Sequence, residues 1–141
     1  MVILMKAYYI IASFVVVFFS CKSMKDKSLS QICYDRGFSQ PVEKVSLRDT
    51  QRIKQLEGRF VEMEGVFRYA FEDVALYPSR TAEPPEAMWV NIRVPDTASD
   101  KLLDELNERN VVIIGKVNLK RRGHYSGYIG TLDSAFCIKA K

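Results

Sequence analysis

Two long segments of the chain alternate between apolar and polar residues, as half-buried β-strands do. In the first segment, the alternate positions that are mainly apolar are Val61, Met63, Gly65, Phe67, Tyr69 and Phe71. In the second they are Val111, Ile113, Gly115, Val117 and Leu119. Because successive side chains of a strand point to opposite faces, each segment predicts a strand with one buried face. Gly65 and Gly115 within these strands predict a bulge or a sharp bend of the kind that barrel closure requires.

Three shorter strands and two helices complete the pattern. Strands are predicted at 74–77 and 88–94, each followed by a proline, and a last one follows Gly123. Its core candidates are Ile129, Leu132, Phe136 and Ile138, with Gly127 or Gly130 permitting a bend. Between the third and fourth strands, Thr97 and Asp100 have the spacing of a helix-opening capping box, and Asn110 can end that helix. Upstream, Leu47, Ile53 and Leu56 predict a short helix closed by Gly58.

This order of elements predicts an all-β fold with added helices. Strand, strand, strand, helix, strand, strand is the order of the OB-fold, a five-stranded Greek-key barrel with a helix between strands three and four. SH3-like barrels are the alternative, and the intervening helix argues against them. The chain also resembles a family of small, largely uncharacterised bacterial OB-fold lipoproteins over residues 45–138. The matching segments are VSL at Val45, LEGRFVEMEG at Leu56, ALY at Ala75, MWV at Met88, NVVIIG at Asn110 and GH at Gly123. The resemblance is to structural motifs and implies no activity.

The N-terminus predicts an export signal. Lys6 is the only charge in residues 1–20, and an apolar run of 14 residues follows it from Ala7 to Ser20. Since about 20 apolar residues are needed to cross a bilayer, a permanent span is the weaker interpretation. Met5 is an alternative start to Met1.

The residues that end this run resemble the lipobox of bacterial lipoproteins. Phe18, Phe19 and Ser20 precede Cys21, and Phe19 stands where that motif usually has a small or β-branched residue. The resemblance implies that Cys21 carries a diacylglycerol and usually an amide-linked chain, which together anchor a protein stably. Ordinary signal cleavage near Ser20, with Cys21 as a bystander, is the alternative. We therefore divide the chain into a lipoprotein signal peptide (1–20), a polar tether (21–31) and an OB-fold-like domain (32–141).

The charge is modest overall but uneven. The chain carries 21 Lys and Arg against 17 Asp and Glu, a formal charge of +4, which falls to +3 without residues 1–20. Residues 111–141 hold six basic residues and only Asp133 as an acid, a net +5. Such asymmetry can mark an anionic partner, and it also occurs on ordinary solvated faces.

Two cysteines, Cys33 and Cys137, remain once Cys21 is assigned to lipid. In an oxidising compartment this even pair could form a disulfide. Two separate buried thiols are the other interpretation, and the sequence leaves both open.

The chain offers little for catalysis. A Ser126–His124–Asp133 triad would have to come from one strand region, and no nucleophile elbow accompanies it. The sequence holds no clustered metal ligands, no Walker loop and no dinucleotide fingerprint. We therefore expect no enzyme, no cofactor and no metal, and an envelope hydrolase is a remote alternative.

A basic and aromatic set is the best candidate for binding. The turn between the last two strands reads KRRGHY, and the outer face of the third strand carries Trp89 and Arg93. In OB-folds this turn and the face of strands two and three commonly bind ligands. The predicted ligand-binding residues are Tyr77, Trp89, Arg93, Arg121, Arg122 and His124. Alternatively, Trp89 is covered by the segment Ile32–Val42 in a second small core, and the turn is a solvated hairpin.

These features favour a membrane-anchored, exported binding module. Its expected partner is an envelope protein, an anionic glycan or a lipid headgroup, and nucleic acid is not expected in that compartment. A structural or assembly lipoprotein that binds only proteins is the alternative. The sequence does not distinguish the inner from the outer membrane.

Overall fold

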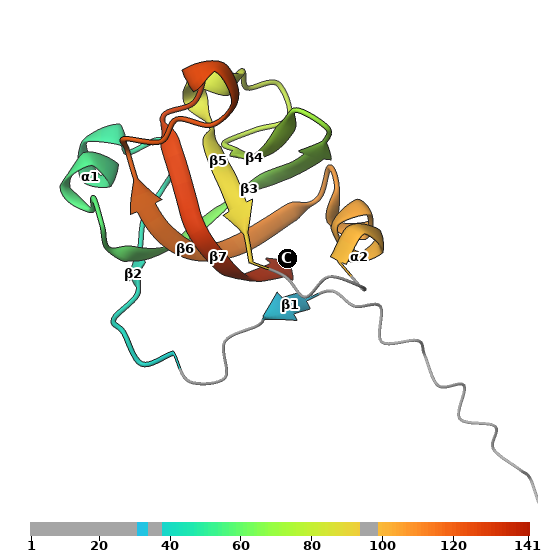
Figure 1. Ribbon diagram of the computed structural model, residues 1–141, viewed down its shortest axis with the longest axis horizontal. Coiled ribbons are helices and arrows are strands. Elements are labelled where there is room, and N and C mark those ends of the chain that lie inside the picture. The colour runs from blue at the N-terminus through green and yellow to red at the C-terminus, as the bar shows by residue number, and fades with distance from the viewer. Residues whose placement is uncertain (1–30, 34–37, 94–98) are drawn as a thin grey trace, which may run out of the picture.

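The computed structural model describes residues 31–33, 38–93 and 99–141 (Figure 1). The predicted signal segment, Cys21 and Thr97 lie outside these residues. Within the described part, neither helix reaches the length and apolarity needed to cross a bilayer.

The described chain consists mainly of strands. They are β1 (Gln31–Cys33), β2 (Glu43–Lys44), β3 (Phe60–Ala70), β4 (Asp73–Tyr77), β5 (Met88–Ile92), β6 (Asn110–Asn118) and β7 (Gly130–Ala140). The α-helices are α1 (Thr50–Gln55) and α2 (Ser99–Leu106), and single 3₁₀ turns are η1 (Pro84–Glu86) and η2 (His124–Ser126).

Five of the strands close into a barrel. β3 pairs with β4, β4 with β5, β6 with β7 and β6 with β3, all antiparallel, and β5 pairs with β7 in parallel. The circuit therefore returns to its first strand, with α2 between β5 and β6 (Figure 1). β1 adds to β7 and β2 adds to β3 outside this circuit. This confirms a mostly β, OB-like barrel of five strands with added helices.

The barrel interior is built from the parity that the sequence predicted. Val61, Met63 and Phe67 of β3 are fully buried. They lie beside the inward residues of β6, which are Val111, Ile113 and Val117. Gly65 lies on the same inward face of β3. A Cβ at this position would collide with the carbonyl oxygen of Tyr77 and crowd the Leu47 side chain, so only glycine fits. The predicted glycine is thus a point of close approach inside the bent strand.

A second buried cluster lies on the outer face of β4 and β5. Its members are Val66, Ala75, Tyr77, Ala82, Ala87 and Tyr128, with Trp89 packed against them. The hydroxyls of Tyr77 and Tyr128 both donate to Asp73 Oδ1, at 2.7 and 3.0 Å. The segment between β4 and β5 contributes Ala82 and Ala87 to this cluster, so it covers the outer face of these strands and shields it from solvent.

Three assignments from the sequence were wrong in detail. Phe71 is 98% exposed, because β3 ends at Ala70 and Phe71 lies in the tight turn before β4. Phe136 faces outward and packs on Phe38, with ring centroids 4.6 Å apart. Asn110 begins β6 and does not end the helix, which stops at Leu106.

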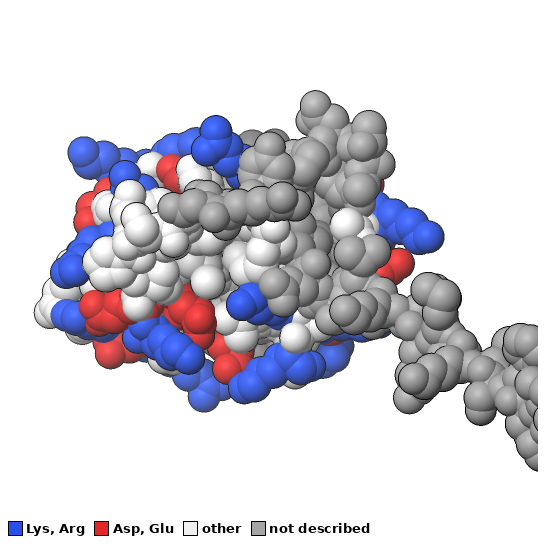
Figure 2. Space-filling view, turned by 90° about the horizontal axis from the view of Figure 1, so that it is seen from below, with Lys and Arg blue, Asp and Glu red and all other residues white. Residues whose placement is uncertain are grey.

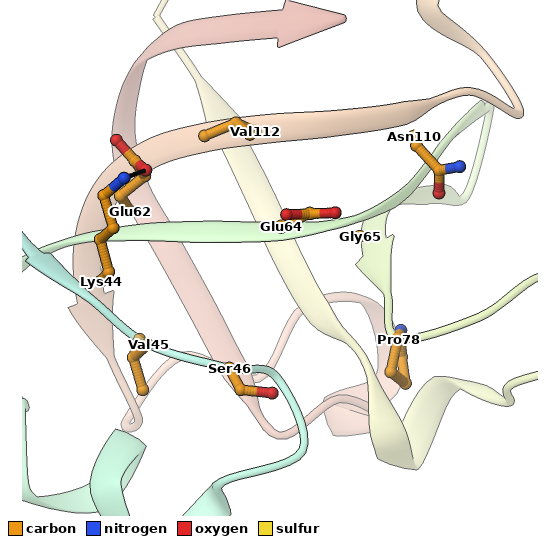
Figure 3. A pocket seen from close by; sticks show the side chains of 9 residues that line it. All are labelled: Lys44, Val45, Ser46, Glu62, Glu64, Gly65, Pro78, Asn110 and Val112. Atoms are coloured by element: carbon orange, nitrogen blue, oxygen red, sulfur yellow. Dashed lines mark ion pairs between the residues drawn. The ribbon is translucent and has the colours of Figure 1, made fainter. Parts of the chain in front are cut away.

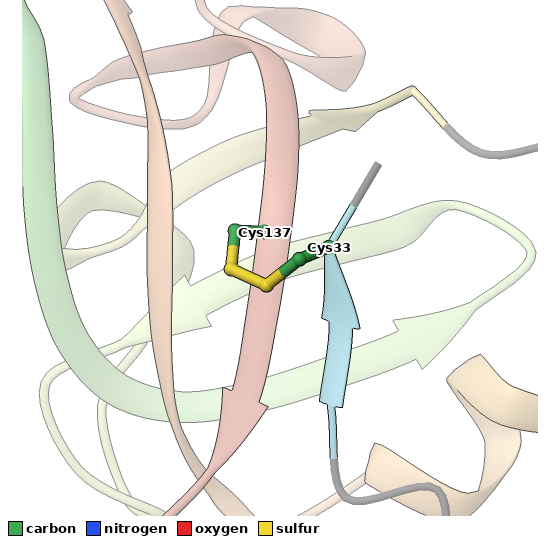
Figure 4. The surroundings of a disulfide bond; sticks show 2 residues. All are labelled: Cys33 and Cys137. Carbon is green, nitrogen blue, oxygen red and sulfur yellow. A yellow bond between two sulfur atoms is a disulfide. The ribbon is translucent and has the colours of Figure 1, made fainter. Parts of the chain in front are cut away.

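A disulfide joins Cys33 to Cys137 (Figure 4). The two residues lie opposite each other in the antiparallel pairing of β1 with β7. β1 begins at Gln31, the last residue of the predicted tether. The bond therefore links the start of the described chain to the last strand of the barrel.

Candidate functional site

The basic turn and the tryptophan predicted from the sequence meet in one groove. The groove has a volume of about 390 Å³ and lies between the β6–β7 loop and β5. Its lining residues are Trp89, Lys120, Arg121, Arg122, Gly123, His124, Ser126 and Thr131. We call it the basic–aromatic groove. It contains four of the six predicted ligand-binding residues, namely Trp89, Arg121, Arg122 and His124.

Hydrogen bonds to side chains fix the backbone of the basic turn. The Asn118 Oδ1 atom, at the end of β6, accepts from the backbone N–H groups of Lys120 and Arg121, both at 3.1 Å. From the other strand, the Thr131 hydroxyl donates to the carbonyl oxygen of Arg121 at 2.7 Å. The turn is thus held at both its entrance and its exit, so its basic side chains start from a fixed backbone.

The three basic side chains have different surroundings. Arg121 forms an ion pair with Asp133 at 3.1 Å, and Arg122 Nε donates to the carbonyl oxygen of Tyr128 at 2.8 Å. Lys120 is exposed and makes no side-chain ion pair with any residue of the described part. Asp133 pairs with only one of these bases, Arg121, and the charges of Lys120 and Arg122, without such a pair in the described part, suit an anionic ligand.

Trp89 forms the aromatic wall of the groove and is only partly buried. Its ring packs edge-to-face on Tyr128, with centroids 5.2 Å apart. Gly123, at φ +66°, passes so close that a Cβ there would stand 2.8 Å from two carbon atoms of Trp89. Phe38, in the segment Ile32–Val42 that the alternative interpretation placed over Trp89, packs on Phe60 and Phe136.

His124 links the basic turn to the turn between β3 and β4. Its Nε2 atom lies 3.7 Å from Glu72 Oε1, and its ring lies 4.0 Å from that of Tyr125 at 83°. Tyr125 is 89% exposed and has a left-handed backbone (φ 50°), and Phe71 next to Glu72 is also exposed. Two large aromatic side chains therefore project into solvent beside the groove.

Sequence reasoning missed both of these aromatic residues. Tyr125 was visible in the KRRGHY turn, and Gly123 before it signals a loop in which a side chain is free of the sheet. Phe71 was assigned to the buried face because its parity matches that of Phe67. The signal for Phe71 was the run of polar residues after it, Glu72 and Asp73, which suits a turn better than a strand.

Tyr77 and Arg93 do not line the groove. Tyr77 shares the outer face with Trp89, as parity predicted, but it is completely buried beneath the β4–β5 segment. The Arg68 guanidinium lies 4.0 Å over its ring, and burial together with the hydrogen bond to Asp73 raises the pKa of Tyr77. The pKa of Tyr128 is also raised, chiefly by burial. Arg93 is exposed just beyond β5. Neither side chain contributes to the lining of the groove.

A second groove lies on the outer side of β2, β3 and β6 (Figure 3). It has a volume of about 450 Å³. Its charged residues are already paired, since Lys44 lies 3.0 Å from Glu62 and Lys141 lies 2.6 Å from Glu64. No aromatic side chain lines it. With its charges neutralised and no stacking surface, it is the weaker candidate.

Within the described residues, neither the Ser126–His124–Asp133 relay nor a metal-binding cluster is formed. Asp133 accepts from Asn91 and Asn118, at 3.2 and 2.6 Å, and pairs with Arg121. The acid that faces His124 is Glu72 and not Asp133, so the Ser126–His124–Asp133 relay is not formed. Among residues 31–33, 38–93 and 99–141, no three His, Cys, Asp or Glu side chains are placed to hold a metal ion.

Comparison with known proteins finds little that is similar. No protein family and no curated protein matches the chain. Among solved structures, it is similar to a putative aspartyl-tRNA synthetase from Leishmania major Friedlin, with 11% identity and a TM-score of 0.44. The match covers 77% of this chain and 22% of that chain. A likeness this distant bears neither on function nor on the assignment of the groove.

Proposed function

We propose that this protein is an exported, lipid-anchored binding module of the cell envelope. Its OB-fold barrel would bind an anionic glycan or lipid headgroup at the basic–aromatic groove. The observation that carries the proposal is the convergence of Trp89 with Lys120, Arg121 and Arg122 on one groove, from segments about thirty residues apart.

The chemistry of the lining supports an anionic ligand with a flat face. Lys120 supplies an ammonium group with no acidic partner among the described residues, and the guanidinium of Arg122 can donate to phosphate, sulfate or carboxylate oxygens. The ring of Trp89 offers a surface on which a sugar ring can stack. Because the backbone of the turn is already fixed, binding would order few groups, which lowers its entropic cost.

Two observations support export and anchoring. The N-terminal apolar run ends at the lipobox-like Phe18–Cys21. The disulfide between Cys33 and Cys137 suits an oxidising compartment outside the cytosol. Labelling with a clickable fatty acid tests the anchor: the wild type should incorporate label, and a Cys21→Ser protein that labels equally would refute it.

Charge-matched variants test the groove. Lys120→Ala/Arg122→Ala removes two basic groups from the lining, and Lys54→Ala/Arg59→Ala removes the same two residue types from exposed positions outside it. With a fluorescent heparin oligosaccharide as the anionic glycan, the groove variant should bind about tenfold more weakly, equivalent to about 1.4 kcal/mol. Its dependence on salt should also be shallower. Equal losses in the two variants would refute a specific site.

A second candidate function is binding to proteins alone. The exposure of Phe71 (98%) and Tyr125 (89%) favours it, because aromatic side chains are enriched at the centres of protein interfaces. Under this function, Phe71→Ala/Tyr125→Ala would abolish association with a crosslinked envelope protein. The groove variant Lys120→Ala/Arg122→Ala would leave that association intact. The reverse pattern would favour the anionic ligand.

A further inference from the structure

The described chain enters the barrel at the end of β7 that is remote from the basic–aromatic groove. Gln31 pairs with Lys139, near the end of β7, and Thr131 at its start lines the groove. At about 3.3 Å per residue, these two positions of β7 are about 25 Å apart along the strand. Figure 1 shows the same separation, with β1 at the bottom of the barrel and the β6–β7 loop with η2 at the top.

Two features fix this entry point. β1 runs antiparallel to β7, so its first residue, Gln31, is the residue of β1 that lies farthest from the groove along β7. The disulfide between Cys33 and Cys137 adds a covalent bond to the backbone pairing of this short strand (Figure 4). A three-residue strand held only by hydrogen bonds could detach, whereas a bonded one cannot leave β7.

We infer that β1 and its disulfide orient the anchored protein so that the basic–aromatic groove faces away from the membrane that holds the lipid. The inference rests on the proposed anchoring at Cys21. The groove then takes its anionic ligand from the space beyond the protein, as a glycan, and not from the headgroups of its own membrane. Of the two ligands proposed above, this orientation favours the anionic glycan over the lipid headgroup.

The lengths of the segments support this orientation. Gln31 lies ten positions after Cys21, and a tether of that length, as the sequence predicts, would have an r.m.s. reach of about 18 Å. The end of the barrel beside β1 is therefore held close to the bilayer, and the groove is displaced by a further 25 Å or so along β7.

The charges of the end beside β1 also agree with a passive membrane-facing role. Figure 2 looks onto the barrel from that side, and its described surface shows Lys and Arg mainly around the rim with Asp and Glu between them. Interspersed signs give weak attraction to anionic lipid, whereas a single-sign basic patch gives strong attraction. The aromatic residues with the greatest exposure, Phe71 and Tyr125, lie at the opposite end beside the groove.

The single tryptophan of the chain allows a direct test, because Trp89 lies in the groove. The full-length lipidated protein is placed in phosphatidylcholine vesicles that contain a dansyl-headgroup lipid, and energy transfer from tryptophan to dansyl is measured. Trp89→Phe/Lys139→Trp moves the donor to the entry point of the chain, and Trp89→Phe/Gln31→Trp repeats this from the other strand. Transfer should be at least about threefold stronger from the entry point, since transfer to a layer of headgroup acceptors falls steeply with distance and the two ends lie about 25 Å apart.

Each outcome separates the orientation from the proposed function. Equal transfer from Trp89 and from both entry-point donors overturns the orientation. So does stronger transfer from Trp89 when phosphatidylglycerol is added, because the groove would then hold headgroups. Mass spectrometry of the same wild-type protein detects the lipid independently. If the wild type carries no lipid and does not associate with the vesicles, the anchor is refuted, and the orientation with it. Weak transfer from Trp89 without binding of the heparin oligosaccharide refutes the proposed ligand and leaves the orientation standing.

Discussion

Replacing Gly123 by alanine tests how closely the basic turn approaches Trp89. Gly123 has φ +66° and ψ −159°, a conformation that is essentially restricted to glycine and costs other residues about 1–3 kcal/mol. The new Cβ would also stand 2.7 Å from Tyr128 Cδ2 and 2.8 Å from Trp89 Cβ and Cδ2. Overpacking of this kind typically costs a further 1–3 kcal/mol. We therefore expect Gly123→Ala to lower the free energy of unfolding by about 2–6 kcal/mol.

Gly58→Ala is the matched control for this prediction. Gly58 also has a positive φ, +75°, but nothing lies within 4 Å of a Cβ built there. It should therefore lose only about 1–2 kcal/mol of backbone strain. Urea unfolding gives both free energies, and the emission of the single tryptophan should shift in folded Gly123→Ala and not in Gly58→Ala. A loss in Gly123→Ala no larger than in Gly58→Ala, with unchanged emission, would refute the close packing of the turn against Trp89.

Three other perturbations probe the second cluster, the disulfide and the exposed loop. Burial and the hydrogen bond to Asp73 raise the pKa of Tyr77, so the stabilisation by the neutral phenol is complete below about pH 10 and is lost as the pH rises further. In urea unfolding at a series of pH values, Tyr77→Phe should therefore show a shallower loss of stability above that pH than the wild type. An equally steep loss would contradict this prediction. Cys33→Ser/Cys137→Ser should lower the free energy of unfolding by about 2–5 kcal/mol, as should a reductant on the wild type, because the bond spans 104 residues; insensitivity to reductant would exclude the bond. Tyr125→Ala should change stability by less than about 0.5 kcal/mol, since the side chain is 89% exposed; a large loss of stability in urea unfolding would show that it packs.

The barrel could be predicted from the sequence because its strands bury one face. Val61, Met63 and Phe67 had to alternate with polar residues, and the same alternation from Val111 identified a second strand, which the structure pairs with the first. The close spacing of the basic turn made half of the groove predictable as well. Its other half, Trp89, is brought to the turn by the parallel pairing of β5 with β7, which the order of elements implied.

What could not be predicted is which outward faces are covered. Parity placed Tyr77 on the face of Trp89, but the segment that buries it has no periodic pattern, and its contact residues Ala82 and Ala87 are small. The end of β3 was missed for a related reason. The turn after Ala70 contains Phe71 and no glycine. Phe71 therefore extends the alternating apolar pattern one position beyond the end of β3. Such ends and lids depend on contacts between distant segments, which local patterns do not record.

The position of β7 also sets the order in which the protein can fold. β7 pairs with β1, β5 and β6, so it contributes to three of the seven strand pairings among the described residues. A chain made from its N-terminus has none of these three pairings until β7 is available, and β5 and β6 meanwhile expose open edges. A chain shortened by the eleven residues of β7 would keep most of the apolar residues of the barrel without a way to close it. We therefore expect such a fragment to aggregate, and the barrel to close only after β7 has been synthesised.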